Sequence, residues 1–298
     1  MTKRFDQFLA IDWSGAKGPR QKGIALALAE QAGPPQLLHP KGAAWSRPEV
    51  LEFLQNQTSD RTLIGVDMGI SLPFIDADAF FPDWKDSPND AKSLWALIDE
   101  TCCDDPHLEC ASFLEHAQVS RYFRHSNIRE GERFHLPDAA SREGRFRQAE
   151  LAQRNQGIRP VSNFNLVGAA QVGKSSLTGM RMLNRLRGTI NVWPIDPVPD
   201  AGPVLVEIYT AIATRSGGIA KGKTKIRDYA ALNAALGQLG SPPVQVDGLG
   251  NGPIDDHSSD ALVSAAWLRN VANVEKFWRP TGLTKQIAQT EGWTFGAV

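Results

Sequence analysis

The chain has 298 residues, enough for one large domain or two modest ones with a sizeable hydrophobic core. Its 42% hydrophobic and 22% charged residues are typical of an ordinary soluble globular protein, and a formal net charge of −1 argues against a strongly basic nucleic-acid binder. No apolar run approaches the roughly 20 residues that span a bilayer, and no apolar signal segment follows Met1–Asp6. We therefore expect a cytoplasmic protein with no membrane partner.

Four apolar runs near the N-terminus predict strands, over residues 6–12, 23–30, 36–44 and 61–67. A helix is expected from Ser46 to Gln57, because Ser46 and Glu49 form a capping box and Pro48 fits the first turn. The turn Ser14–Gly18 after the first strand carries Lys17, a candidate phosphate contact. Strands alternating with a helix in this way indicate an α/β or α+β beginning.

The middle of the chain has a different character. Residues 74–160 are rich in Asp, Arg, Pro and His with weak periodicity, and a segment this long is expected to hold helices of its own. A short basic helix over 179–187 and short strands over 189–193 and 204–210 follow. Helices are expected over 225–239 and 256–274.

These elements predict a discontinuous core with a large insertion. The core comprises 1–75 and 189–275, the partly helical insertion comprises 76–188, and the tail 276–298 is expected to pack on the core. The near-neutral net charge conceals two blocks within the insertion: 76–115 has eleven acids and two bases, and 121–187 has thirteen bases and five acids. Either the basic block follows a phosphate backbone, or the two blocks pair with each other or form solvated helix faces. The candidate phosphate contacts in this block are Arg121, Arg124, Arg145 and Arg147.

Three cysteines, Cys102, Cys103 and Cys110, lie close to His107 and His116 and raise the question of a zinc site. Their spacing matches no standard pattern, because vicinal cysteines rarely bind one tetrahedral ion together. We expect reduced structural thiols.

Four acidic residues border apolar runs: Asp12, Asp67, Glu207 and Asp260. An ionised carboxylate is costly to desolvate without a partner, so several of them predict a converging cluster held together by Mg²⁺ or Mn²⁺. In the last predicted helix, Asp256 shares a face with Asp260 and is a further candidate metal ligand.

Each acid also has a purely structural interpretation. Asp12 and Asp67 can cap the turns that follow them, and Glu207 can lie on the surface of an edge strand. Asp256 and Asp260 are favoured in a first helical turn by the helix dipole.

The segment Gly168–Ser175 satisfies the phosphate-loop pattern G-x-x-x-x-G-K-[ST] and offers Lys174 to phosphates. Its context favours this function only in part. The strand expected before it is short and irregular, Gly179 interrupts the helix after it, and the loop lies in mid-chain.

Together these pieces resemble the ribonuclease H-like fold, and more closely a bacterial family of uncharacterised proteins predicted to be ribonuclease H-like nucleases. The resemblance covers roughly 6–73 and 200–270. It rests on four motifs, Ala10-Ile-Asp-Trp-Ser-Gly15, Gly65-Val-Asp-Met-Gly-Ile-Ser-Leu-Pro73, Val206-Glu-Ile-Tyr-Thr210 and Asp256-His-Ser-Ser-Asp-Ala-Leu262. Gly168–Arg187 is similar to the glycine-rich segment of that family.

The resemblance implies a mixed five-stranded sheet flanked by helices and a metal-dependent nuclease. Asp12, Asp67 and Asp260 match the metal-binding acids of the fold, and His257 resembles the His-x-x-Asp arrangement of resolvase-like members. Glu207 matches an additional acid of the family. In a two-metal hydrolase, Asp12 would bridge two Mg²⁺ or Mn²⁺ ions, Asp67 and Asp260 would complete their shells, and Glu207 would position a water.

Two other classes of function stay open at this point. The first is an ATP-using phosphotransferase, either of the actin-like type or with a phosphate loop at Gly168–Ser175, although no internal repeat is found. The second is a non-catalytic module of the same fold that binds nucleic acid or protein.

Overall fold

A mixed six-stranded β-sheet forms the centre of the protein. The computed structural model describes residues 4–126, 129–135, 143–168, 171–219, 225–245 and 252–298. The strands lie in the order β3-β2-β1-β4-β6-β5. They are β1 (Gln7–Asp12), β2 (Ala25–Glu30), β3 (Gln36–Leu38), β4 (Thr62–Asp67), β5 (Asn191–Trp193) and β6 (Val204–Glu207).

The first three strands are antiparallel neighbours, and β1, β4, β6 and β5 run parallel to one another. The resemblance implies five strands, whereas the sheet has six, because the short strand expected over 189–193 is observed as β5 and pairs with the outer edge of β6. The third strand covers only three residues of the expected 36–44.

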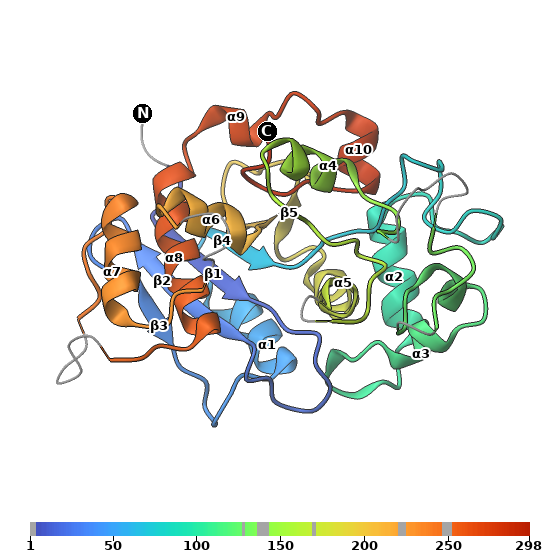
Figure 1. Cartoon of the computed structure of the whole chain (residues 1–298), viewed down its shortest axis with the longest axis horizontal. Coiled ribbons are helices and arrows are strands. Elements are labelled where there is room, and N and C mark those ends of the chain that lie inside the picture. The colour runs from blue at the N-terminus through green and yellow to red at the C-terminus, as the bar shows by residue number, and fades with distance from the viewer. Residues whose placement is uncertain (1–3, 127–128, 136–142, 169–170, 220–224, 246–251) are drawn as a thin grey trace.

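Helices cover both faces of this sheet, as Figure 1 shows. They are α1 (Arg47–Gln57), α2 (Ala91–Thr101), α3 (Ala111–Glu115), α4 (Gln148–Asn155), α5 (Val172–Leu186), α6 (Thr210–Ser216), α7 (Tyr229–Gln238), α8 (Asp256–Val271), α9 (Glu275–Trp278) and α10 (Lys285–Thr290). Two 3₁₀ turns, η1 (Pro106–Leu108) and η2 (Val119–Tyr122), complete the set in the described part of the chain. Helix α8 packs on β1 and β2 and is itself covered by α6 and α7.

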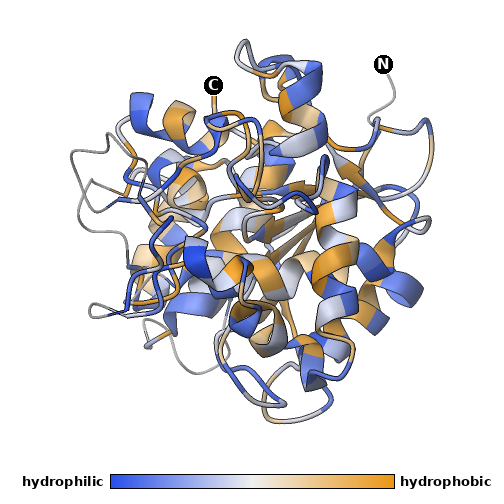
Figure 2. Cartoon of the chain, turned by 90° about the vertical axis from the view of Figure 1, so that its right-hand side faces the viewer, coloured by the Kyte–Doolittle hydropathy of each residue, from blue (hydrophilic) through white to orange (hydrophobic). Residues whose placement is uncertain are grey.

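Alternation along the strands divides the core into two clusters, one on each face of the sheet. Phe8 and Ala10 of β1 belong to the cluster that contains α8, whereas Leu9 and Ile11 belong to the cluster that contains α1, α2 and α5. In Figure 2 the hydrophilic loops lie mainly at the periphery, outside these packed layers. Each acid at a strand end is therefore assigned to one face by its position in the alternation.

The boundaries of most predicted helices are close to those observed. Helix α1 has the predicted capping box: Ser46 Oγ accepts from the Glu49 N–H at 3.2 Å, and Glu49 accepts from the Ser46 N–H at 2.9 Å. Helix α5 starts earlier than expected and continues through Gly179, where the missing side chain makes room for Met68. The strand expected over 204–210 ends at Glu207, and α6 begins three residues later.

Residues between 76 and 188 share one hydrophobic core with the sheet. Phe81, Trp95 and Leu177 lie in the same buried cluster as Leu9 and Ile64. The division of the chain at residues 75 and 189 stays a prediction.

The acidic and basic blocks pair with each other, which confirms one of the two interpretations of the charge pattern. Four ion pairs join them in the described part of the chain: Arg133–Asp83 at 2.7 Å, Arg145–Asp76 at 2.5 Å, Arg181–Asp99 at 2.9 Å and Arg185–Asp99 at 3.0 Å. The charge in these blocks therefore serves largely to join one segment to another.

The C-terminal segment lies against the carboxyl end of β6. The Phe295 N–H donates to the Glu207 carbonyl at 2.8 Å, and Trp293 and Phe295 are buried. Among the described helices, none is both long and apolar enough to cross a membrane.

Candidate metal and active site

Asp12 and Asp67 lie opposite each other at the carboxyl ends of the parallel strands β1 and β4. Both occupy the alternation positions of Ala10 and Leu63, whose side chains belong to the α8 face of the core. Helix α8 brings Asp260 to the same place, because the negative charge of Asp260 acts on Asp67 and that of Asp12 acts on Asp260. The structure therefore brings together three acids from distant parts of the sequence.

Burial and mutual repulsion raise the pKa of these carboxyl groups. The pKa of Asp67 lies well above its ordinary value because of burial and the charges of Asp12 and Asp260. Burial and the charge of Asp12 raise the pKa of Asp260 to about 7. Ionising all of these carboxyl groups together is therefore costly, and a bound cation would lower the free energy of the ionised cluster.

His257, near the N-terminus of α8, pairs with one of the three acids. Its Nδ1 lies 2.7 Å from Asp12 Oδ2. This hydrogen bond raises the pKa of His257, whereas burial raises the pKa of Asp12 in spite of it. His257 is half-exposed, so it lies between the acids and solvent.

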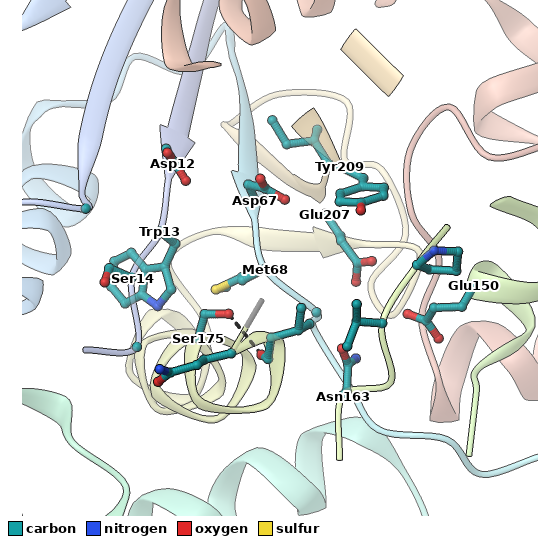
Figure 3. A pocket seen from close by; sticks show the side chains of 18 of the residues that line it. Asp12, Trp13, Ser14, Asp67, Met68, Glu150, Asn163, Ser175, Glu207 and Tyr209 are labelled. Carbon is teal, nitrogen blue, oxygen red and sulfur yellow. Dashed lines mark hydrogen bonds between the residues drawn. The ribbon is translucent and has the colours of Figure 1, made fainter. Parts of the chain in front are cut away.

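A cavity of about 400 Å³ opens at the carboxyl ends of β1, β4 and β6. Asp12, Asp67 and His257 line one part of it, and Glu150 and Glu207 line another. Figure 3 shows Asp12 and Asp67 at the ends of neighbouring strands, with Glu207 set apart from them toward Glu150. Much of the remaining wall comes from Trp13–Ala16, Met68–Gly69 and the start of α5.

Glu207 belongs to a separate buried network, which corrects its expected role at the metal cluster. It pairs with Val66, whose side chain lies on the α1/α5 face, so its carboxylate projects away from the α8 face. Arg147 donates to both of its oxygens at 2.6 and 2.8 Å, and the Ile70 N–H and Thr294 hydroxyl also donate to them. With four donors already bound, Glu207 has no oxygen left to hold a metal or a water.

Arg147 is the centre of this network and is only 1% exposed. All five of its N–H donors bond to Glu150, Glu207 or the Glu291 carbonyl. Burial would lower its pKa, but the charges of Glu150 and Glu207 raise it above its ordinary value. Arg147 therefore lines the cavity without a donor to offer a phosphate.

The other arginines proposed as phosphate contacts are also engaged. Arg145 is buried and bonds to Asp76 and to three backbone carbonyls. Arg121 pairs with Glu132, and Arg124 pairs with Glu130 at 3.2 Å. These four arginines are therefore held by intramolecular contacts rather than left free for a phosphate backbone.

Asp256 is expected from the sequence to bind metal, but the structure pairs it with basic side chains. It pairs with Lys225, and Arg227 lies 3.9 Å away. Two exposed cations therefore compensate its charge. Asp256 does not line the cavity, although its negative charge acts on Asp260.

The phosphate-loop motif lacks the structure that gives such a loop its function. No strand leads directly into it over residues 161–168, and its positions 169–170 lie outside the described residues. The N–H groups of Lys174 and Ser175 donate to the Gln171 carbonyl and that of Gly173 to the Asn165 carbonyl, so they cannot hold a phosphate. Ser175 Oγ donates to the Val172 carbonyl at 2.9 Å.

The three cysteines are free thiols, with Cys102 and Cys110 buried and Cys103 exposed. Burial raises the pKa of Cys102 and of Cys110 to about 12, which keeps both thiols neutral.

Two site residues escaped the sequence interpretation. Thr210 Oγ1 donates to Asp67 Oδ2 at 2.8 Å and holds this carboxylate in place. Tyr209 lines the cavity, and burial with the nearby charges of Asp67 and Glu150 raises its pKa to about 12. They lie two and three residues after the end of β6, and a strand boundary at Glu207 is the signal that would have identified them.

The donor set fits a hard divalent cation. Within the described ranges no three His, Cys, Asp or Glu side chains already form a set that could hold a metal ion. Asp12, Asp67 and Asp260 nevertheless supply the carboxylate oxygens that Mg²⁺ and Mn²⁺ prefer, and none of them has a lysine or arginine ion pair in the described residues.

No family model, curated protein or solved structure matches this chain.

Proposed function

We propose that the protein is a divalent-metal-dependent phosphodiester hydrolase, a nuclease, built on a ribonuclease H-like core. The strand order β3-β2-β1-β4-β6, with three antiparallel strands followed by parallel ones, supports the proposed core. The observation that carries the function is the pairing of Asp12 with Asp67 beside Asp260, three partly buried carboxylates with raised pKa values.

Asp12, Asp67 and Asp260 are the residues that would hold Mg²⁺ or Mn²⁺. A pair of these ions held there would lower the pKa of an attacking water and stabilise the leaving oxygen of a phosphodiester. Thr210 fixes the orientation of Asp67, and the half-exposed His257 transfers a proton between the cavity and solvent.

The test is hydrolysis of single-stranded, duplex and structured DNA and RNA, and of the small diester bis(4-nitrophenyl) phosphate, with and without Mg²⁺ or Mn²⁺. We expect metal-dependent cleavage that falls at least about 100-fold in Asp67→Asn. The matched control is Asp86→Asn, the same change at an exposed position. Lack of cleavage over the whole panel, or equal activity in Asp67→Asn, would overturn the proposal.

A further inference from the structure

A second, smaller hollow lies beside the acidic cavity and has a different charge. Lys17, on the loop after β1, and Lys174, on the first turn of α5, both line it. Gly15 lines both hollows and separates them. The two hollows are therefore neighbours on the surface of the protein.

Positive charge is in excess at this second hollow. Lys17 is exposed and Lys174 is half-buried, and neither makes an ion pair with any described residue. Glu109 is the carboxylate on its wall, and it accepts from the Gly18 N–H at 2.6 Å. Cys110 also lines the hollow, but burial raises its pKa to about 12, so it adds no negative charge.

A third cation lies beneath the loop. Arg47 is buried and donates to the carbonyls of Ser14, Ala16 and His107, so its hydrogen bonds go to neutral groups. Its charge acts on Glu109 and Cys110, which places it next to the hollow. Arg47 thus both fixes the loop that carries Lys17 and adds to the positive potential there.

The acidic cavity has no comparable charge to offer. Arg147 is the cation that lines it, and each of its donors is already bound to the protein. Inside the cavity, a phosphate group next to the scissile one would therefore meet carboxylates, neutral polar groups and a histidine already bonded to Asp12, with no free lysine or arginine among the lining residues. Lys17 and Lys174 lie outside, beyond Gly15.

We infer that Lys17 and Lys174 form a subsite for the phosphate next to the scissile phosphodiester of a nucleic-acid strand. This inference rests on the proposed function and narrows its substrate from any phosphodiester to a polymer with neighbouring phosphates. The strand crosses the loop at Gly15, whose backbone packs so closely on α5 that a side chain would collide with Lys174 and Ser175.

The subsite is tested by binding, which does not depend on catalysis. A fluorescein-labelled single-stranded oligonucleotide is titrated with the full chain in Ca²⁺ buffer over a range of KCl concentrations. In the variant with both Lys17→Gln and Lys174→Gln we expect about 10-fold weaker binding at about 0.1 M salt. The slope of log K against log salt should fall by about 1.4, from about 0.7 for each lost contact to single-stranded nucleic acid.

The control removes two exposed lysines elsewhere, with Lys276→Gln and Lys285→Gln on α9 and α10. This control has the same change in net charge, and we expect the affinity and slope of the parent. Lys17→Gln alone changes an exposed loop residue, so it tests half of the effect without risk to α5. Hydrolysis of bis(4-nitrophenyl) phosphate, which has a single phosphate, should be the same in the double variant as in the parent.

The outcomes separate the subsite from the proposed function. A parent that does not bind the oligonucleotide, or a double variant with the parent's affinity and slope, overturns the subsite whether or not the small diester is hydrolysed. Salt-dependent binding that the double variant loses, with no hydrolysis of either substrate, keeps the subsite and rejects the hydrolase.

Discussion

Asp67 is the register partner of Asp12, whereas Glu207, one strand further along the sheet, is the register partner of Val66. This offset of one residue places the first two carboxylates on the α8 face and the third on the opposite face. Three acids that end parallel strands therefore divide into two groups with different chemistry. Asp12 and Asp67 repel each other, and Glu207 is neutralised by Arg147.

Because the carboxylates repel each other, we predict that the site lowers the free energy of unfolding of the metal-free protein. A carboxyl group with a raised pKa adds stability fully below its unfolded pKa, and this contribution is lost as the pH rises through its folded pKa. For Asp260 this pH window runs from the ordinary carboxyl pKa of 3.8 to a pKa of about 7. Asp260→Asn should therefore raise the free energy of unfolding by about 1–3 kcal/mol at about pH 8, and by less as the pH falls.

The measurement is urea unfolding in EDTA at two pH values, with Asp86→Asn as the exposed control. A loss of stability in Asp260→Asn at the higher pH would show that its carboxylate has a stabilising partner, contrary to the account.

Replacing Glu207 should have the opposite effect on the free energy of unfolding. Glu207→Ala leaves Arg147 buried with part of its charge unpaired, and we expect the free energy of unfolding to fall by about 3–5 kcal/mol. Glu52→Ala, at an exposed position of α1, should change it by less than about 0.5 kcal/mol. Guanidinium unfolding monitored by tryptophan fluorescence compares the two, and equal stabilities would contradict the structural role.

Thr210 should act on the metal site through Asp67. Thr210→Val removes the hydroxyl that donates to Asp67 Oδ2 at 2.8 Å, and we expect divalent metal affinity to fall about 10-fold. Thr210→Ser restores the donor and should restore the affinity, which calorimetry with Mn²⁺ measures. A serine variant as weak as the valine variant would mean that packing of the methyl group, rather than the hydrogen bond, matters.

Two glycines should respond in opposite directions to alanine. A Cβ at Gly15 would collide with the backbone of α5, so Gly15→Ala should lower the unfolding free energy by at least about 1–3 kcal/mol. A Cβ at Gly237 in α7 meets open space, so Gly237→Ala should raise it by about 0.5–1 kcal/mol. Thermal unfolding of both variants tests the packing of the loop on α5, and a Gly15→Ala protein as stable as the parent would contradict it.

The sequence was informative wherever the relevant partner is local. The strand ends at Asp12 and Asp67 follow from apolar runs that stop at an acid, and the α1 capping box follows from Ser46 and Glu49, three residues apart. The α/β class and the helices on both faces follow from the same periodicities.

The role of Glu207 could not be predicted in this way, because it depends on Arg147 and Thr294, 60 and 87 residues away. The partners of the basic block could not be predicted for the same reason: a run of arginines does not show that Arg145 meets Asp76 across 69 residues. The strand β5 is expected over 189–193, but its place at the edge of the sheet depends on its pairing with β6, which the sequence does not show. Contacts over such distances are set by the topology of the chain and leave no local pattern.

The most direct test of the central claim is calorimetric titration of Mn²⁺ into the parent, Asp67→Asn and Glu207→Gln at about pH 8. We predict that the parent binds divalent metal, that Asp67→Asn loses this binding, and that folded Glu207→Gln retains it. A parent that binds no metal would favour a non-catalytic module, and metal binding that survives Asp67→Asn but is lost in Glu207→Gln would contradict the assignment of the site to the α8 face.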